Sequence, residues 1–193
     1  MIKKKGSEVV DSGAEEYKRY LDGDDDGIVK LIATYKDGLL FYLNGFTHSL
    51  EDAEELTEDT FVKLAIEKPR YNGKAAFKTW LYTIARNLTI DRLRKEQAWR
   101  WVPLENAEDA IDREDAAAVL LRTERDRRVH AAMKTLTPEQ QQVLWLVYFE
   151  DFSSAEIGMI LGKKAAAVDS LAYRARKALK EELERSGFTY ENS

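Results

Sequence analysis

Four polar side chains near the C-terminus have the types and spacing of a surface that reads nucleic acid. They recur at positions i, i+3, i+4 and i+7, which places them on one face of a helix: Ser170, Tyr173, Arg174 and Lys177. The opposite face of that helix carries an apolar row for the core: Val168, Leu171, Ala175, Leu179 and Leu183. Hydroxyl, phenol and cationic groups can donate to base edges and phosphates in the major groove. The alternative is a solvated face on a helical hairpin that never touches DNA.

Two helix-start signals precede this segment and predict a helix-turn-helix. The run from Thr137 to Gln140 places Thr at the N-cap, Pro at the first helical position and Gln at the third. The run from Ser153 to Glu156 is a second capping box, and Gly162 ends the short helix that it opens. A longer helix follows at once, which is the order of a DNA-reading helix-turn-helix.

Catalytic and metal-binding chemistry has little support in the sequence. The chain has no cysteine, and its two histidines, His48 and His130, stand far apart with no Glu-x-x-His pair. Ser153 and Ser154 lack a histidine partner by motif and are better explained as helix caps. We expect no enzymatic activity, no cofactor and no metal site.

One stretch imitates a calcium-binding loop without completing it. Residues 22–27 place acids at loop positions 1, 3 and 5 and glycine at position 6, but position 12 is Ala33 rather than glutamate. Because the bidentate ligand is missing, we interpret this stretch as a turn and helix cap.

The elements that must position these residues are all helical. Of 193 residues only 3 are proline and 10 are glycine, and apolar residues recur at spacings of three and four rather than alternating. We predict an all-α fold: two small helical domains joined by an acidic linker, with the helix-turn-helix in the C-terminal domain. Expected first-domain helices lie around residues 26–45, 51–67 and 76–96. The expected boundaries are a tail at 1–16, a first domain at 17–98, a linker at 99–115, a second domain at 116–185 and a tail at 186–193.

The net charge of -5 and the pI of about 5.3 argue against a nucleic-acid partner only if the charge is averaged over the whole chain. Residues 74–100 carry seven basic against two acidic side chains, and residues 162–180 carry six against one, so each segment has a local charge of +5. Residues 51–59 carry six acids and no base, and residues 105–115 carry six acids against one arginine. Since salt screens charges beyond about 8–10 Å, a DNA backbone senses the local patch. Each run alone is also compatible with a solvated helix face.

The start of the chain is basic but lacks the apolar stretch of a signal peptide. No segment approaches the roughly 20 apolar residues that span a bilayer. We expect a cytoplasmic protein without a membrane span.

Five segments together resemble the extracytoplasmic-function sigma factors of the sigma-70 family, the two-domain bacterial transcription initiation subunits. The resemblance covers roughly residues 22–100 and 120–184. It is carried by DAEELTEDTF at 52–61, FKTWLYTIARNLTIDRLR at 77–94, LTPEQQQVL at 136–144, AEIGMILG at 155–162 and YRARKAL at 173–179.

The resemblance implies that the first segment binds the clamp helices of the RNA polymerase beta-prime subunit. The residues on the matching positions are Asp52, Glu55, Leu56, Asp59 and Phe61. A helix of charge -6 with apolar anchors suits a basic partner helix. Leu56 and Phe61 could instead belong to the domain's own core.

The second segment resembles the helix and preceding loop that melt and read the promoter's minus-ten element. Asn87 falls on the position that captures a flipped base, with Tyr71 and Tyr82 for aromatic contact. Basic side chains available for phosphates are Lys74, Lys78, Arg86 and Arg92. Apolar residues of this helix are expected in the core: Phe77, Trp80, Leu81, Ile84 and Leu88. Tyr82 and Arg86, four residues apart, are expected on the opposite, DNA-facing side.

The helix-turn-helix, by the same resemblance, reads the minus-thirty-five element. Ser170, Tyr173 and Arg174 fall on DNA-contacting positions, with Arg176 and Lys177 near the backbone. The family further implies core RNA polymerase, including its beta flap, promoter DNA and an anti-sigma factor as partners. The acidic linker would thread toward the RNA exit channel and active-site cleft.

Some residues depart from the family pattern. Glu58 replaces a usual glutamine, Asp169 and Leu171 stand where basic residues are common, and residues 163–167 replace a Ser/Thr-rich helix start. An acid at Asp169 would repel phosphate but could accept from a cytosine amino group. Two alternatives stay open: a helix-turn-helix regulator acting without polymerase, and a polymerase-binding adaptor with weakened promoter recognition.

Overall fold

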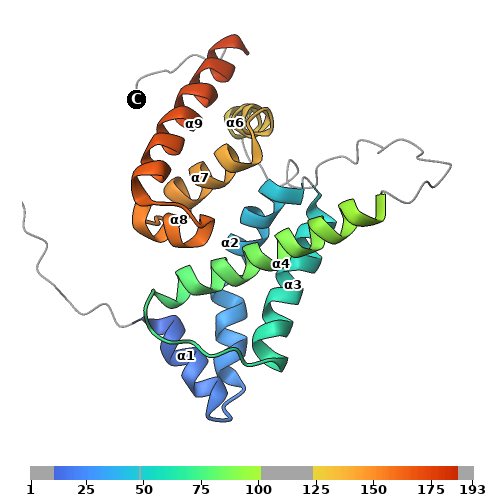
Figure 1. Cartoon of the computed structure of the whole chain (residues 1–193), viewed down its shortest axis with the longest axis vertical. Coiled ribbons are helices and arrows are strands. Elements are labelled where there is room, and N and C mark those ends of the chain that lie inside the picture. The colour runs from blue at the N-terminus through green and yellow to red at the C-terminus, as the bar shows by residue number, and fades with distance from the viewer. Residues whose placement is uncertain (1–10, 48, 101–123, 187–193) are drawn as a thin grey trace, which may run out of the picture.

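The structure is a computed structural model that describes residues 11–47, 49–100 and 124–186. Within these ranges the chain is helical and contains no strand, as predicted. The helices are α1 (Ser12–Leu21), α2 (Asp26–Thr47), α3 (Leu50–Ile66), α4 (Phe77–Arg100), α6 (Glu124–Lys134), α7 (Pro138–Tyr148), α8 (Ser154–Leu161) and α9 (Ala165–Arg185). Figure 1 shows two groups of helices, α1–α4 and α6–α9. The predicted linker at 99–115 and the tails lie mostly outside the described residues.

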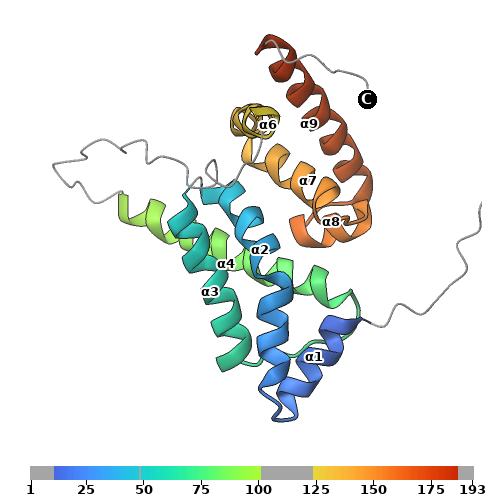
Figure 2. The ribbon, with the colours of Figure 1, turned by 180° about the vertical axis from the view of Figure 1, so that it is seen from behind.

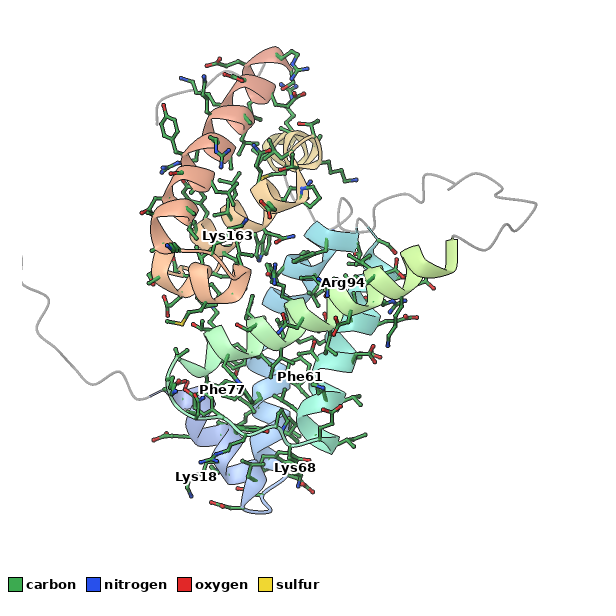
Figure 3. All side chains as sticks on the ribbon, in the orientation of Figure 1. Lys18, Phe61, Lys68, Phe77, Arg94 and Lys163 are labelled. Carbon is green, nitrogen blue, oxygen red and sulfur yellow. The ribbon has the colours of Figure 1, made fainter. Side chains whose placement is uncertain are left out.

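The first group surrounds the long helix α2, which packs against α1, α3 and α4. The Ser49 side chain caps α3 by accepting a hydrogen bond from the Asp52 amide. Leucine and aromatic side chains of all four helices form the core, and Figure 3 shows Phe61 and Phe77 pointing into it. The helices expected around 26–45, 51–67 and 76–96 are therefore confirmed, each within a few residues.

Helix α1 includes residues 12–16, which were expected to be part of a tail. It is held by two buried tyrosines whose hydroxyls donate to distant carbonyls: Tyr17 to Pro69 at 2.8 Å and Tyr20 to Ala65 at 2.8 Å. Gly13 lets α1 approach α4 closely, since a methyl group at this position would lie 2.5 Å from the Phe77 ring. Burial, reinforced by Tyr20, raises the pKa of Tyr17 to about 12. These contacts make α1 part of the first helical group.

The second group is built from the helix starts that the sequence predicted. Thr137 and Ser153 both form complete capping boxes, with Gln140 and Glu156 as the reciprocal partners. Gly162 ends α8 in the left-handed conformation, with φ of 66°. Helix α9 then crosses both α7 and α8, which completes the helix-turn-helix.

The two groups pack directly against each other. Helix α8 lies on the N-terminal half of α4, and α7 lies on α2, as both views show (Figures 1 and 2). Phe41 of α2 meets Trp145 of α7 with ring centroids 5.5 Å apart, and Tyr82 of α4 meets Phe152 at 5.1 Å. Both contacts join residues that the sequence assigned to different domains.

Candidate nucleic-acid and polymerase interface

Helix α9 presents the predicted polar face to solvent. The predicted DNA-contacting residues are all exposed: Ser170, Tyr173, Arg174, Arg176 and Lys177. Tyr173 is 64% exposed, so its ring and hydroxyl are accessible to a partner. Behind this face, Val168, Leu171, Ala175 and Leu183 are buried and Leu179 is partly buried, as expected. The structure therefore brings these polar groups together on the exposed side of α9.

Two departures from the family pattern have structural explanations. The Ser154 hydroxyl donates a hydrogen bond to the Asp169 carboxylate, so this acid links the start of α8 to the first turns of α9. Leu171 is 6% exposed and belongs to the core. Asp169 is nevertheless exposed on the same helix as Tyr173, so its charge is present at the predicted DNA surface.

Tyr82 is fully buried, which corrects the expectation that it lies on an exposed face of α4. Its ring packs between Tyr42 of α2 and Phe152, at centroid distances of 5.3 and 5.1 Å. Burial, and next the neighbouring Glu150 carboxylate, raise the pKa of Tyr82 above its ordinary value. Tyr82 is thus enclosed by α2 of its own group on one side and by Phe152 of the second helical group on the other, and helical periodicity within α4 cannot reveal the second contact.

Lys78 and Arg86 are also less available than expected. The Lys78 ammonium lies 2.8 Å from a Glu150 carboxylate oxygen and donates to the Glu150 carbonyl at 2.9 Å. Arg86 is partly buried beside Tyr42, and its Nε has no hydrogen-bond partner among the described residues. Asn87, in contrast, is exposed.

The loop before α4 holds Lys74 in solvent and Tyr71 in a hydrogen-bond network. The Tyr71 hydroxyl donates to the Ala75 carbonyl and lies 3.2 Å from the Asp11 carboxylate. Asp11 also accepts from the amides of Ala14 and Phe77, so it ties the start of α1 to the start of α4. Burial, followed by the Asp11 charge, raises the pKa of Tyr71 to about 12. The Tyr71 ring packs on Trp80 at 5.2 Å and is half-buried.

Helix α3 carries the predicted polymerase surface, but only its acids face solvent. Asp52, Glu55 and Asp59 are not buried, whereas Leu56 is 2% and Phe61 6% exposed. Leu56 and Phe61 thus lie in the first group's own core, which was the alternative considered from sequence.

Two apolar residues of α3 that sequence reasoning did not select are exposed instead. Val62 is 50% and Ile66 77% exposed. Their spacing of four residues, one turn beyond Glu58 and Asp59, places them on the acidic side of the helix. The spacing of Val62 and Ile66 is visible in the sequence and could have identified them as part of the acidic side of the helix. The helix therefore offers acids followed by apolar anchors on one surface.

The predicted turn at residues 22–27 is confirmed, and its acids serve the fold. Asp24 pairs with Arg19 and accepts the Asp26 amide at the start of α2. The described part of the chain contains no group of three or more His, Cys, Asp or Glu side chains arranged to hold a metal. In the same part, no helix combines the length and apolar character required to cross a membrane.

Comparisons with known proteins agree with this arrangement. Residues 31–100 match the family Sigma-70 region 2, and residues 126–179 match Sigma-70, region 4. RNA polymerase sigma factor YlaC of Bacillus subtilis is 31% identical over 163 residues, which cover 83% of this chain and 94% of that protein. ECF RNA polymerase sigma factor SigW of Bacillus subtilis is 28% identical over 178 residues, with coverages of 86% and 94%.

Two solved structures share the fold. The structure of CnrH in complex with the cytosolic domain of CnrY has a TM-score of 0.63 at 19% identity, covering 90% of this chain and 98% of that one. The sigma factor RpoE in complex with the anti-sigma factor NepR from Bartonella quintana has a TM-score of 0.61 at 22% identity, with coverages of 80% and 95%. With two family matches in order and a relative aligned over nearly its full length, this chain belongs to the extracytoplasmic-function RNA polymerase sigma factors of the sigma-70 family, which are transcription initiation factors.

Proposed function

We propose that this sigma factor binds core RNA polymerase through the acidic side of α3, opens the minus-ten element with α4 and its preceding loop, and reads the minus-thirty-five element with α9. The observation that carries the proposal is that both sigma-70 regions are present and that each retains an exposed surface of the required chemistry. Promoter DNA and core polymerase are the partners, and the cytoplasm is the place of action.

The α3 surface suits a basic helical partner. Asp52, Glu55 and Asp59 supply negative charge that steers association, and Val62 and Ile66 supply apolar area at one end. Burial of such apolar side chains contributes binding free energy, while exposed charges mainly set the association rate. We therefore extend the polymerase surface from the acids to these two residues and assign Leu56 and Phe61 to the core that supports it.

The α4 surface suits an unpaired strand. The exposed Asn87 amide can donate to and accept from the edge of an extruded base. Extrusion costs a few kcal/mol, which base-edge hydrogen bonds and stacking of about 1–3 kcal/mol per base can offset. Lys74 is exposed in the loop and available to a phosphate.

The α9 surface suits the major groove. Tyr173 and Arg174 stand on adjacent positions of an exposed helical face, and Arg176 and Lys177 flank it for backbone contact. Asp169 near the start of α9 favours a cytosine amino group over a phosphate at that end. An anti-sigma protein is a further proposed partner, because both solved relatives are complexes. RpoE was solved with the anti-sigma factor NepR, and CnrH was solved with the cytosolic domain of CnrY.

Reconstituted transcription tests the proposal. Core RNA polymerase is mixed with the full chain and a library of duplex DNA sequences, and the transcript starts are sequenced. We expect stable core binding and starts that share two upstream motifs separated by a fixed spacing. Absence of core binding together with absence of specific starts would overturn the proposal. Specific duplex binding without polymerase would support the regulator alternative instead.

A further inference from the structure

We propose that Asp169, held in place by Ser154, selects cytosine at one position of the upstream element. This role rests on the proposed function of α9 in reading the minus-thirty-five element and adds a base preference to it. It also divides the exposed face of α9 into two parts, with hydrogen-bond acceptors on the second turn of the helix and hydrogen-bond donors on the turn that follows.

The acceptors belong to two exposed residues, Asp169 and Ser170. A carboxylate accepts hydrogen bonds and donates none. The Ser170 hydroxyl donates its hydrogen to the Ala166 carbonyl at 3.0 Å, so toward DNA its oxygen acts as an acceptor. The exposed residues of α9 before Asp169 are the alanines 165–167, whose side chains have no polar atom. This part of α9 therefore offers acceptors and methyl groups to a base, but no side-chain donor.

The donors lie one turn further along, at Tyr173 and Arg174, which are also exposed. Arg174 Nε donates to the Ser170 carbonyl at 3.3 Å, and its terminal guanidinium nitrogens form no hydrogen bond or ion pair within the described part of the chain. An arginine that donates to both acceptors of guanine is the commonest specific contact in the major groove. The second part of the face therefore suits guanine, and the first part suits a base that carries a donor.

A carboxylate in the major groove discriminates among the four bases. Cytosine presents an amino donor there and no acceptor, whereas guanine presents only acceptors and thymine an acceptor beside a methyl group. Adenine presents an amino donor next to an acceptor nitrogen, which repels the second carboxylate oxygen. Phosphates also repel a carboxylate, so Asp169 gains from DNA only where it meets a donor on a base. Cytosine is therefore the base that Asp169 favours.

The Ser154 hydroxyl fixes the Asp169 side chain. Ser154 is the first residue of α8, and its Oγ donates to Asp169 Oδ1 at 2.5 Å. The second carboxylate oxygen has no hydrogen bond, and Asp169 has no ion pair, among the described residues. Since one oxygen is held and the other is open on an exposed surface, the carboxylate is oriented before DNA arrives, which lowers the entropy lost on binding.

The turn between α8 and α9 holds Ser154 close to Asp169. The Lys163 amide donates to the Gly158 carbonyl at 2.8 Å, and a methyl group at Gly158 would lie 2.6 Å from the Lys163 carbonyl oxygen. The chain therefore turns back on α8 with no room for a side chain at this point. A tether between the two helices would by itself explain the Ser154 hydrogen bond, but a tether has no base preference. The base preference at one DNA position therefore separates the two roles.

Selection from a library of duplexes with a randomised upstream element tests the base preference. The full chain is used with core polymerase in one arm and alone in the other, and the bound DNA is sequenced. We expect one position at which the parent protein prefers cytosine at least about fivefold, the lower limit for one good side-chain contact to a base. Loss of core binding with this cytosine preference intact would overturn only the proposed function. A selected motif without a preferred cytosine, or no motif in either arm, would overturn the role of Asp169.

Asp169→Asn tests the base chemistry with little change of shape. An asparagine amide donates and accepts together, which matches the edge of adenine. The variant should change the preferred base at one position from cytosine to adenine and leave the rest of the motif as it was. Its matched control is Glu184→Gln, which removes the same charge near the other end of α9, where Glu184 pairs with Lys180. A change in overall affinity without a change in base preference would contradict the assignment, because a structural or purely electrostatic residue gives that result.

Ser154→Ala tests the positioning role. The variant should weaken the cytosine preference at the same position about threefold or more without creating a new preference, since the carboxylate remains but is no longer held. Its control is Ser186→Ala, because the Ser186 hydroxyl donates to the Leu183 carbonyl at the far end of the same helix. An unchanged preference in Ser154→Ala protein that is folded by circular dichroism would overturn the role of Ser154.

A modified duplex tests the base donor without changing the protein. N4-methylcytosine still pairs with guanine, but its methyl group takes the place of the amino hydrogen that faces the major groove. Placed at the selected position, it should weaken binding of the parent at least about fivefold, and placed outside the motif it should not. In Asp169→Ala the same modification should have a smaller effect, since no carboxylate remains to lose its donor. Equal binding of the parent to the plain and the modified site would overturn cytosine recognition.

Discussion

Arg92 of α4 lies 2.7 Å from the Glu55 carboxylate of α3, so a predicted DNA contact and a predicted polymerase contact form an ion pair with each other. A second nitrogen of the same guanidinium lies 3.3 Å from Asp52. Exposed pairs of this kind contribute at most about 1 kcal/mol each. Arg92 thus links α3 to α4 between the two proposed binding surfaces.

The apolar end of α3 gives a prediction about polymerase binding. Val62→Asp should weaken binding of core polymerase about tenfold or more, because a carboxylate would replace an apolar anchor at the interface. Affinity can be measured by fluorescence titration of labelled protein with core enzyme. Val29→Asp is the control, since Val29 is 60% exposed on α2 and lies outside the proposed surface. Equal losses for the two variants would contradict the assignment of Val62.

The exposed face of α9 gives a prediction about the upstream contact. Tyr173→Ala combined with Arg174→Ala should reduce protection of the minus-thirty-five region in footprints of the polymerase complex. A lost base contact costs about 1–3 kcal/mol, so promoter affinity should fall at least about fivefold. Because both side chains are exposed, the melting temperature should stay near that of the parent. Unchanged footprints would argue against α9 as the reading helix.

Asp11 gives a prediction about stability. Asp11→Ala removes the acceptor for the Ala14 and Phe77 amides and the partner of the Tyr71 hydroxyl. Loss of a helix cap and of a second hydrogen bond should lower the free energy of unfolding by about 1–3 kcal/mol. Urea denaturation measures this change. A loss below about 0.5 kcal/mol would show that α1 does not depend on this carboxylate.

Glu156 gives a prediction about pH. Burial alone would raise its pKa, but hydrogen bonds from Ser153 and Thr79 and the charge of Lys78 lower it below the ordinary 4.5. A carboxyl with a lowered folded pKa stabilises the protein above its unfolded pKa, and this contribution is lost as the pH falls through the folded value. The parent should therefore lose stability on acidification below pH 4.5.

The control for this effect is Glu156→Gln, which can still form the capping box but cannot titrate. Denaturation at several pH values should show a loss for the parent that exceeds the loss for the variant by about 0.5 kcal/mol. Parallel pH profiles for the two proteins would contradict the role of the Glu156 charge.

Local signals explain why the helix-turn-helix could be predicted in detail. The capping boxes at Thr137 and Ser153 and the left-handed Gly162 act within a few residues, so the sequence alone defines where α7 and α8 begin and where α8 ends. The exposed α9 face follows from periodicity in the same way. Helix α1 was missed because Tyr17 and Tyr20 stand in a charged stretch and become core only against distant carbonyls at Pro69 and Ala65.

Contacts between the two helical groups could not be predicted, because no pattern within one helix records them. Helix α4 is amphipathic by sequence, and Tyr82 does not lie in its apolar row. Tyr82 is nevertheless buried, because it packs against Phe152, 70 positions further along the chain. The same holds for Phe41 and Trp145. Burial of Leu56 and Phe61, with exposure of Val62 and Ile66, depends on how α3 rotates against α2 and α4.

Permanganate footprinting of the polymerase complex at a promoter recovered from the library tests promoter opening most directly. The parent protein should make thymines of the minus-ten region reactive, because melting leaves them unpaired. Asn87→Ala should reduce this reactivity about tenfold or more at equal core affinity, since the variant loses the amide proposed to hold the extruded base. A parent complex that binds core and promoter but leaves these thymines unreactive would contradict the proposed function.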